Sequence, residues 1–204
     1  MTWPIVRLEQ RLIPLSLVRM RYRILSTALT LLFVHVAGST CGGQVPGATR
    51  FVSPDSTYTV LFPGHEPQPG SFVPGTTKQT QFYVNTGGAQ FSVAVFENDY
   101  YRKTNAATIL KNFAATRMGG FAPAAAVVDS AIVVDGVSGT GGRIAGTWLK
   151  APMSEQRTRV FRAFVKDGKL YEVWAFTLGA GPLPDFADEF VKSFHFCRTP
   201  ADCR

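Results

Sequence analysis

Hydrophobic and polar residues alternate in several short segments after residue 50, which is the pattern of half-buried strands. The first segment, 58–62, places a Tyr, a Val and a Phe on one face and ends at a Pro-Gly turn. The next stretch, 65–77, is so rich in Pro and Gly that we expect a loop without any regular element. Two further alternating segments, 78–84 and 90–96, flank a Gly-Gly pair and predict a β-hairpin.

Two Asp-Gly dipeptides, at 135–136 and 167–168, lie between segments rich in β-branched and aromatic residues. An Asp-Gly pair in that setting is the strongest short-range signal of a two-residue hairpin turn. The strands expected in this half of the chain are 127–134, 137 onward, 143–149, 158–165 and 170–176. Because hairpins join antiparallel neighbours, the sheet is expected to be largely antiparallel.

Hydrophobic residues at helical spacing predict one main helix, which Thr104 or Asn105 caps and a Gly-Gly pair ends. A second helix is expected near the C-terminus, with Asp185 in its first turn and Lys192 in its last, where the charges suit the helix dipole. Strands, a helix, strand hairpins and a final helix in this order predict an α+β fold. We therefore expect a largely antiparallel β-sheet packed by two main helices.

The composition favours one folded domain and excludes a wholly disordered chain. Of the 204 residues, 46% are hydrophobic, 12% aromatic and 17% charged. The formal net charge is +7, but residues 1–40 supply +4 of it through five arginines and one glutamate. The remainder has no run of like charge, so no nucleic-acid partner is expected.

The first forty residues predict a signal peptide. An apolar stretch at 24–38 follows a basic cluster and is fifteen residues long. That length suits a secretory signal and is short of the roughly 20 residues that a membrane-spanning helix needs. The segment before the apolar stretch is compact and basic if translation begins at Met20, and long if it begins at Met1.

Two processing routes lead out of this signal peptide. Cleavage after Gly38 frees a soluble periplasmic or secreted chain that starts at Ser39. In the other route Cys41 is lipidated, because the small residues before it and the Gly-rich exit after it resemble a bacterial lipoprotein junction. The resemblance is incomplete, since Gly38 stands where such junctions usually have Leu. Lipidation would anchor the domain to a membrane.

The positions of the three cysteines indicate the cellular compartment of the protein. Cys197 and Cys203 are six residues apart and are expected to form a disulfide that staples the C-terminal tail in an oxidising compartment. Cys41 then has no partner cysteine, which favours the lipid route. The expected organisation is a signal peptide at 1–40, a linker at 41–50, a folded domain at 51–196 and a tail at 197–204.

Some segments of the folded region carry a family resemblance: 51–55 followed by 58–64, then 168–173, then 190–196. They resemble PsbP-like α/β/α sandwich domains, and the resemblance spans about 51–196. The family includes extrinsic subunits of photosystem II, a eukaryotic Ran-binding factor and bacterial envelope proteins. The resemblance implies this fold and a non-catalytic, partner-binding use of it. Because the leader is bacterial in character, photosynthetic and nuclear partners are not carried over.

Catalytic residues, metals and cofactors are not expected. His65 and His195 are the two histidines left after processing, too few for a histidine-rich metal site without carboxylates. His65 and Glu66 share a Pro-rich loop that we interpret as solvated. His195 lies two residues from Cys197, but an oxidised Cys197 cannot act as a nucleophile.

One candidate partner-binding segment precedes the main helix. Tyr100 and Tyr101 lie beside Arg102, and aromatic residues next to cations are common at protein contacts. The alternative is a loop whose tyrosines pack against the edge of the sheet.

The second candidate is a pair of arginines on one strand face, Arg157 and Arg159. One interpretation is that they bind an acidic partner. The alternative is that they pair with a buried carboxylate such as Glu172. Together these residues predict an exported, non-enzymatic accessory or binding domain at the bacterial cell envelope. The alternative function is a small-ligand carrier, or a minor periplasmic hydrolase that uses the His65 loop.

Overall fold

The computed structural model describes residues 44–70, 77–149 and 155–203 of the chain. Within them it has ten strands and three helices. The elements are β1 (Thr49–Val52), β2 (Tyr58–Phe62), β3 (Gln68–Pro69), β4 (Lys78–Thr86), β5 (Ala89–Glu97), α1 (Asp99–Lys103), α2 (Ala106–Met118), β6 (Phe121–Val134), β7 (Val137–Trp148), β8 (Glu155–Lys166), β9 (Lys169–Thr177), α3 (Ala187–Lys192) and β10 (His195–Phe196).

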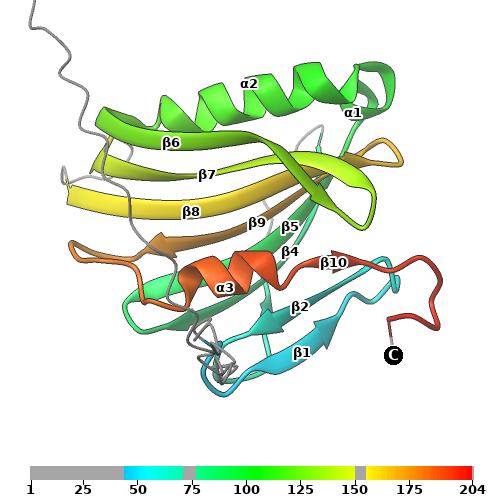
Figure 1. Ribbon diagram of the computed structural model, residues 1–204, viewed down its shortest axis with the longest axis horizontal. Coiled ribbons are helices and arrows are strands. Elements are labelled where there is room, and N and C mark those ends of the chain that lie inside the picture. The colour runs from blue at the N-terminus through cyan, green and yellow to red at the C-terminus, as the bar shows by residue number, and fades with distance from the viewer. Residues whose placement is uncertain (1–43, 71–76, 150–154, 204) are drawn as a thin grey trace, which may run out of the picture. The chain divides into compact units, whose positions relative to one another are not determined.

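Two antiparallel sheets organise the fold. The large sheet has seven strands in the order β3-β4-β5-β9-β8-β7-β6, and the small sheet has three in the order β1-β2-β10. Helix α2 lies over one face of the large sheet, while α3 and the small sheet lie on the opposite side (Figure 1). The predicted α+β class with a largely antiparallel sheet is confirmed.

The two Asp-Gly hairpins are confirmed, and their turns have the expected backbone. Asp135 and Asp167 have φ of 50° and 51°, and the glycines after them also have positive φ. Positive φ at both central residues is the geometry of the type I′ turn, which follows the right-handed twist of paired strands. The hairpin of β4 and β5 around the Gly-Gly pair is also confirmed.

Four details of the sequence prediction are wrong. The expected strand 143–149 is the second half of β7, which runs unbroken from Val137. The 65–77 segment contains the two-residue strand β3, which pairs with β4. The segment before the main helix forms the short helix α1, because the Asn98 side chain caps it by accepting from the N–H of Tyr101. Asp185 precedes α3, whose N-cap is Phe186.

Helix α2 is the predicted main helix. Asn105 caps it, and its side-chain oxygen accepts from the N–H of Ala107 at 2.8 Å. The helix ends at Gly119, as expected. Its buried residues are Ile109, Leu110, Phe113 and Ala114, which pack on the large sheet.

The opposite face of the large sheet holds an aromatic core. Phe194 is fully buried there, between α3 and β10. Its ring centroid lies 5.0 Å from that of Phe196, 5.3 Å from that of Tyr58 and 5.5 Å from that of Phe164. Val45 is buried in the same core, and β1 begins at Thr49, so packed structure starts before Phe51.

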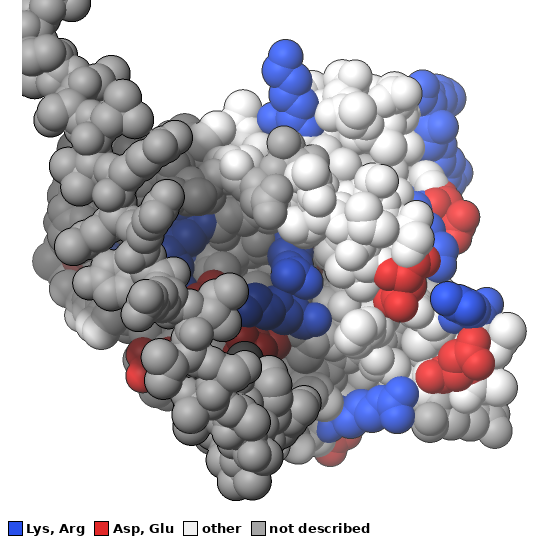
Figure 2. Space-filling model, in the orientation of Figure 1, with Lys and Arg blue, Asp and Glu red and all other residues white. Residues whose placement is uncertain are grey.

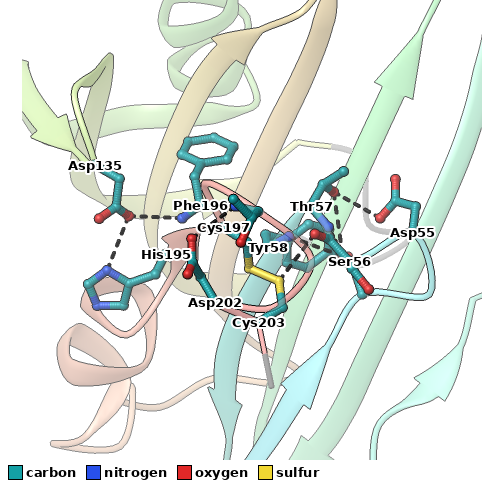
Figure 3. Close-up of a disulfide and its surroundings, with 12 residues drawn as sticks. Asp55, Ser56, Thr57, Tyr58, Asp135, His195, Phe196, Cys197, Asp202 and Cys203 are labelled. Carbon is teal, nitrogen blue, oxygen red and sulfur yellow. Dashed lines mark hydrogen bonds and ion pairs between the residues drawn. A yellow bond between two sulfur atoms is a disulfide. The ribbon is translucent and has the colours of Figure 1, made fainter.

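The C-terminal end of the chain is tied to the rest of the domain at β10 and at Cys197, whose N–H donates to the carbonyl of Thr57 at 3.0 Å (Figure 3). Cys197 and Cys203 form the expected disulfide, with 5.5 Å between their Cα atoms. The carboxylate of Asp135, at the tip of the β6–β7 hairpin, accepts from the N–H of Phe196 at 2.9 Å. It also lies 3.3 Å from Nδ1 of His195. A hairpin tip and the last strand are therefore joined by one side chain.

Candidate functional site

A carboxylate lies at the centre of the sheet face that α2 covers. Glu172 on β9 is fully buried. Its register partners are Ala94 on β5 and Ala163 on β8, which are also fully buried. Because both neighbours across the strands are alanines, the sheet leaves room above this carboxylate for long side chains from other elements.

The first cation at Glu172 is Arg159 on β8. Its Nη2 lies 2.5 Å from Oε1 of Glu172, and its guanidinium stacks over the ring of Trp174 at 5.1 Å. Arg159 is only 6% exposed. Burial lowers the pKa of this guanidinium to about 10, although the charge of Glu172 opposes that effect.

The second cation is Arg117, in the last turn of α2. Its Nη2 donates to Oε2 of Glu172, and its guanidinium lies 4.8 Å from the centre of the Phe113 ring. The Arg117 side chain is 29% exposed, so this end of the cluster reaches the surface. Two guanidinium groups thus share one carboxylate, and the cluster has one excess positive charge.

A pocket of about 240 Å³ lies between α1, α2 and the sheet, and Arg117 forms part of its wall. The other polar side chains of the wall are those of Tyr100, Tyr101, Asn112 and Thr116. Its apolar lining consists of Phe96, Ile109, Phe113 and Leu170. Hydrophobic walls with a few convergent polar groups are typical of binding sites.

Helix α1 places the two tyrosines at this pocket. Tyr100 is 45% exposed, and its hydroxyl accepts from Nδ2 of Asn112 at 3.1 Å. Tyr101 is half-buried, and its ring lies 5.6 Å from that of Tyr100. Burial raises the pKa of the Tyr101 hydroxyl, while the charge of Arg117 opposes this. The two tyrosines therefore form the part of the pocket wall that is nearest to solvent.

Two of the five candidate partner-binding residues, Tyr100 and Tyr101, line this pocket. Arg159 does not line it and is connected to it through Glu172, which also binds Arg117. For Arg159, the structure shows the second of the two expectations, an ion pair with the buried carboxylate of Glu172. Arg117 completes the site and was missed, although a basic residue in the last turn of a predicted helix was the available signal.

The remaining candidates, Arg102 and Arg157, also lie outside the pocket lining. The side chain of Arg102 is 62% exposed and lies 3.9 Å from Asp99 on the same helix. Arg157 is mostly buried, where it donates to the carbonyl of Thr177 and to Glu155, both at 2.6 Å.

The histidines take no part in this site. His65 is exposed, and its Nδ1 lies 3.0 Å from the carbonyl oxygen of Glu66. His195 is exposed beside Asp135, and the sulfur of Cys197 is held in the disulfide. Within 44–70, 77–149 and 155–203, no group of three His, Cys, Asp or Glu side chains is arranged to hold a metal ion. Cys41 and the predicted signal peptide lie outside the described residues.

On the visible part of the face in Figure 2, basic side chains are scattered, and acidic ones lie beside several of them. Among the described helices, none is long and apolar enough to cross a membrane.

Comparison of the sequence with protein-family models and with curated proteins finds no match.

Proposed function

We propose that this chain is an exported, non-enzymatic accessory or binding domain at the bacterial cell envelope, with a PsbP-like α/β/α sandwich fold. The observation that supports it best is the pocket in which the exposed Tyr100 lies beside Arg117. Tyrosine and arginine are the residue types most enriched in the energetically important parts of protein interfaces.

The fold assignment draws on the layers of the domain as well as on the sequence resemblance. A large antiparallel sheet lies between α2 on one face and α3 with the small sheet on the other. The stretches that carry the resemblance include β2, the start of β9 and the segment from α3 to β10. Those segments supply core residues of the aromatic face, such as Tyr58, Tyr171 and Phe194.

Export is supported by the disulfide and by the predicted leader. Disulfides persist in the periplasm and outside the cell and are rare in the cytosol. Lipidation at Cys41 would hold the domain at a membrane, and cleavage before Ser39 would leave it free. The mature chain would begin at Cys41 in the first case and at Ser39 in the second.

A small-ligand carrier is the second candidate, because one buried polar atom favours it. The Tyr58 hydroxyl has no hydrogen-bond partner among the described residues, and Tyr58 is only 2% exposed. Tyr58 also lines a pocket of about 350 Å³, together with Lys78, Glu97 and Lys169. A bound molecule could satisfy this hydroxyl, since buried polar groups are normally paired.

Native and denaturing mass spectra of the protein extracted from its own envelope test the proposal. An associated protein, together with an acyl mass on Cys41 or an N-terminus at Ser39, supports an exported binding domain. A chain that retains a small molecule and no protein favours the carrier. A chain that keeps its leader and reduced cysteines contradicts export.

A further inference from the structure

The charge of the Arg117 cluster is unbalanced. Arg117 and Arg159 are both bonded to Glu172, so one carboxylate serves two guanidinium groups. Arg159 is only 6% exposed, so water does little to screen its charge. Taking charges out of water is costly unless they are paired, so an added anion at the accessible end would be stabilised.

Arg117 has donors left for such an anion. A guanidinium has five N–H groups, and the hydrogen bond that the structure gives Arg117 uses Nη2. Its Nε has no hydrogen-bond acceptor among the described residues, but this atom is buried, as are the unpaired Nε atoms of Arg157 and Arg159. The donors open to a ligand are therefore the remaining N–H groups of its two terminal nitrogens. Because Arg117 also lines the pocket and is 29% exposed, a ligand can approach the guanidinium from the pocket.

The rest of the pocket suits a carboxylate on a short aliphatic stem. Asn112 donates to the Tyr100 hydroxyl, so the proton of that hydroxyl is available to another acceptor. Ile109 and Phe113 supply apolar wall for the stem. A volume of about 240 Å³ is below the roughly 300–1,000 Å³ of sites for drug-sized molecules, so it suits a single side chain.

We infer that the pocket beside Arg117 receives the carboxylate of an acidic side chain from the partner protein. This inference rests on the proposed function and adds the chemistry by which the partner is recognised. The carboxylate would complete a cluster of two cations and two anions, and Tyr100 would cover it from the open side.

The test uses the purified protein with its disulfide intact and two capped tripeptides, acetyl-Gly-Glu-Gly-amide and acetyl-Gly-Gln-Gly-amide. Binding is followed by NMR through the side-chain Nε–H signals of the arginines. We expect a saturable shift of the Arg117 signal with the Glu peptide and affinity at least about tenfold weaker for the Gln peptide, because a charge-assisted hydrogen bond is lost. Equal binding of the two peptides would overturn the inference.

Three variants locate the effect. Arg117→Gln should abolish binding, and it leaves Glu172 paired with Arg159, so the fold should survive. Lys111→Gln removes one exposed charge from the same helix outside the pocket and should bind normally. Asn112→Asp places a carboxylate in the pocket wall at constant volume and should weaken binding of the Glu peptide, which keeps the test informative even if Arg117→Gln unfolds.

Two outcomes separate this inference from others. If inorganic phosphate displaces the Glu peptide at equal concentration, the pocket is a general anion site and the acidic side chain is ruled out. If the Glu peptide fails to bind while mass spectra of the extracted protein still show a protein partner, the inference alone fails and the proposed function stands.

Discussion

Both faces of the large sheet carry a buried apolar cluster, but only the face under α2 has an ion cluster among its buried side chains in the described residues. On the face under α3 and the small sheet, Phe194 lies within 5.5 Å of three other aromatic rings, centroid to centroid. On the face under α2, the fully buried Glu172 carboxylate is paired with two arginines and lies among apolar side chains such as Phe161. One face is held by packing and the other combines packing with ions.

The two kinds of buried group are expected to differ in how much they contribute to the stability of the fold. Apolar packing stabilises a domain directly. A buried ion cluster loses hydration energy that its Coulomb attraction only partly offsets, and apolar replacements of such clusters are often neutral or stabilising. The binding role proposed above would account for an ion cluster that stability alone does not require, and the variants below test this.

The largest loss of stability is expected on the aromatic face. Phe194→Ala removes a fully buried ring from the contacts of four aromatic neighbours. We expect the free energy of unfolding to fall by about 3–5 kcal/mol, from lost burial and the cavity left behind. Urea unfolding followed by tryptophan fluorescence measures it. A loss below about 1 kcal/mol would show that this face is not the main source of stability.

The next effect is expected from Glu172→Gln, which leaves the buried guanidinium of Arg159 and the partly exposed one of Arg117 without their carboxylate. We expect a loss of about 3 kcal/mol, because breaking a buried ion pair strands its charge. The double variant Glu172→Gln/Arg159→Met should regain much of this loss, since it removes the stranded charge. If the double variant is less stable than the single one, the cluster stabilises the fold and the contrast between the faces is wrong.

Alkaline pH should act on the aromatic face. Burial raises the pKa of Tyr58, and raises the pKa of Tyr171 to about 12. Tyrosine in an unfolded chain titrates near pH 10, so above that pH the unfolded state binds fewer protons than the folded one. The contribution of these two tyrosines to stability is then complete below pH 10 and decreases as the pH rises toward 12, while the lowered pKa of Arg159 acts in the opposite direction over this range. Urea midpoints between pH 8 and 11 measure this, and Tyr171→Phe should weaken the dependence; an unchanged dependence would contradict it.

The smallest effect is expected from Arg117→Gln. The variant leaves Glu172 with Arg159 as a balanced pair, and the Arg117 side chain is already partly exposed. We expect a change in unfolding free energy within about 1 kcal/mol, because the variant leaves no buried charge without a partner. Thermal unfolding checks it against Lys111→Gln. A loss above about 3 kcal/mol would make Arg117 a structural residue.

The sequence predicted the elements whose signals are local. Asp135 and Asp167 marked the hairpin turns, and Asn105 marked the start of α2, because turn and cap geometry depend on a few adjacent residues. It missed β3, whose two residues become a strand only through pairing with β4. It also missed α1, because a five-residue helix leaves too few residues for a periodic pattern.

Part of the site was also predictable from a local signal, the Asp-Gly turn. The turn at 167–168 fixes the register of β8 and β9, and that register places Arg159 and Glu172 on one face. The contact between Arg117 and Glu172 depends on how α2 packs across the sheet, and no local sequence pattern determines that packing. The alanines that flank Glu172 were the remaining clue, since small neighbours leave room for long side chains.

The central claim, that the pocket beside Arg117 is where a partner binds, is tested most directly by site-specific photo-crosslinking in the native envelope. A photo-reactive phenylalanine replaces Tyr100 in one strain and Leu178 in another, because both residues are 45% exposed. We predict one discrete protein adduct at position 100, lost in the Arg117→Gln background, and none at position 178. Equal adducts at both positions, or an adduct at position 100 that does not depend on Arg117, would contradict the account.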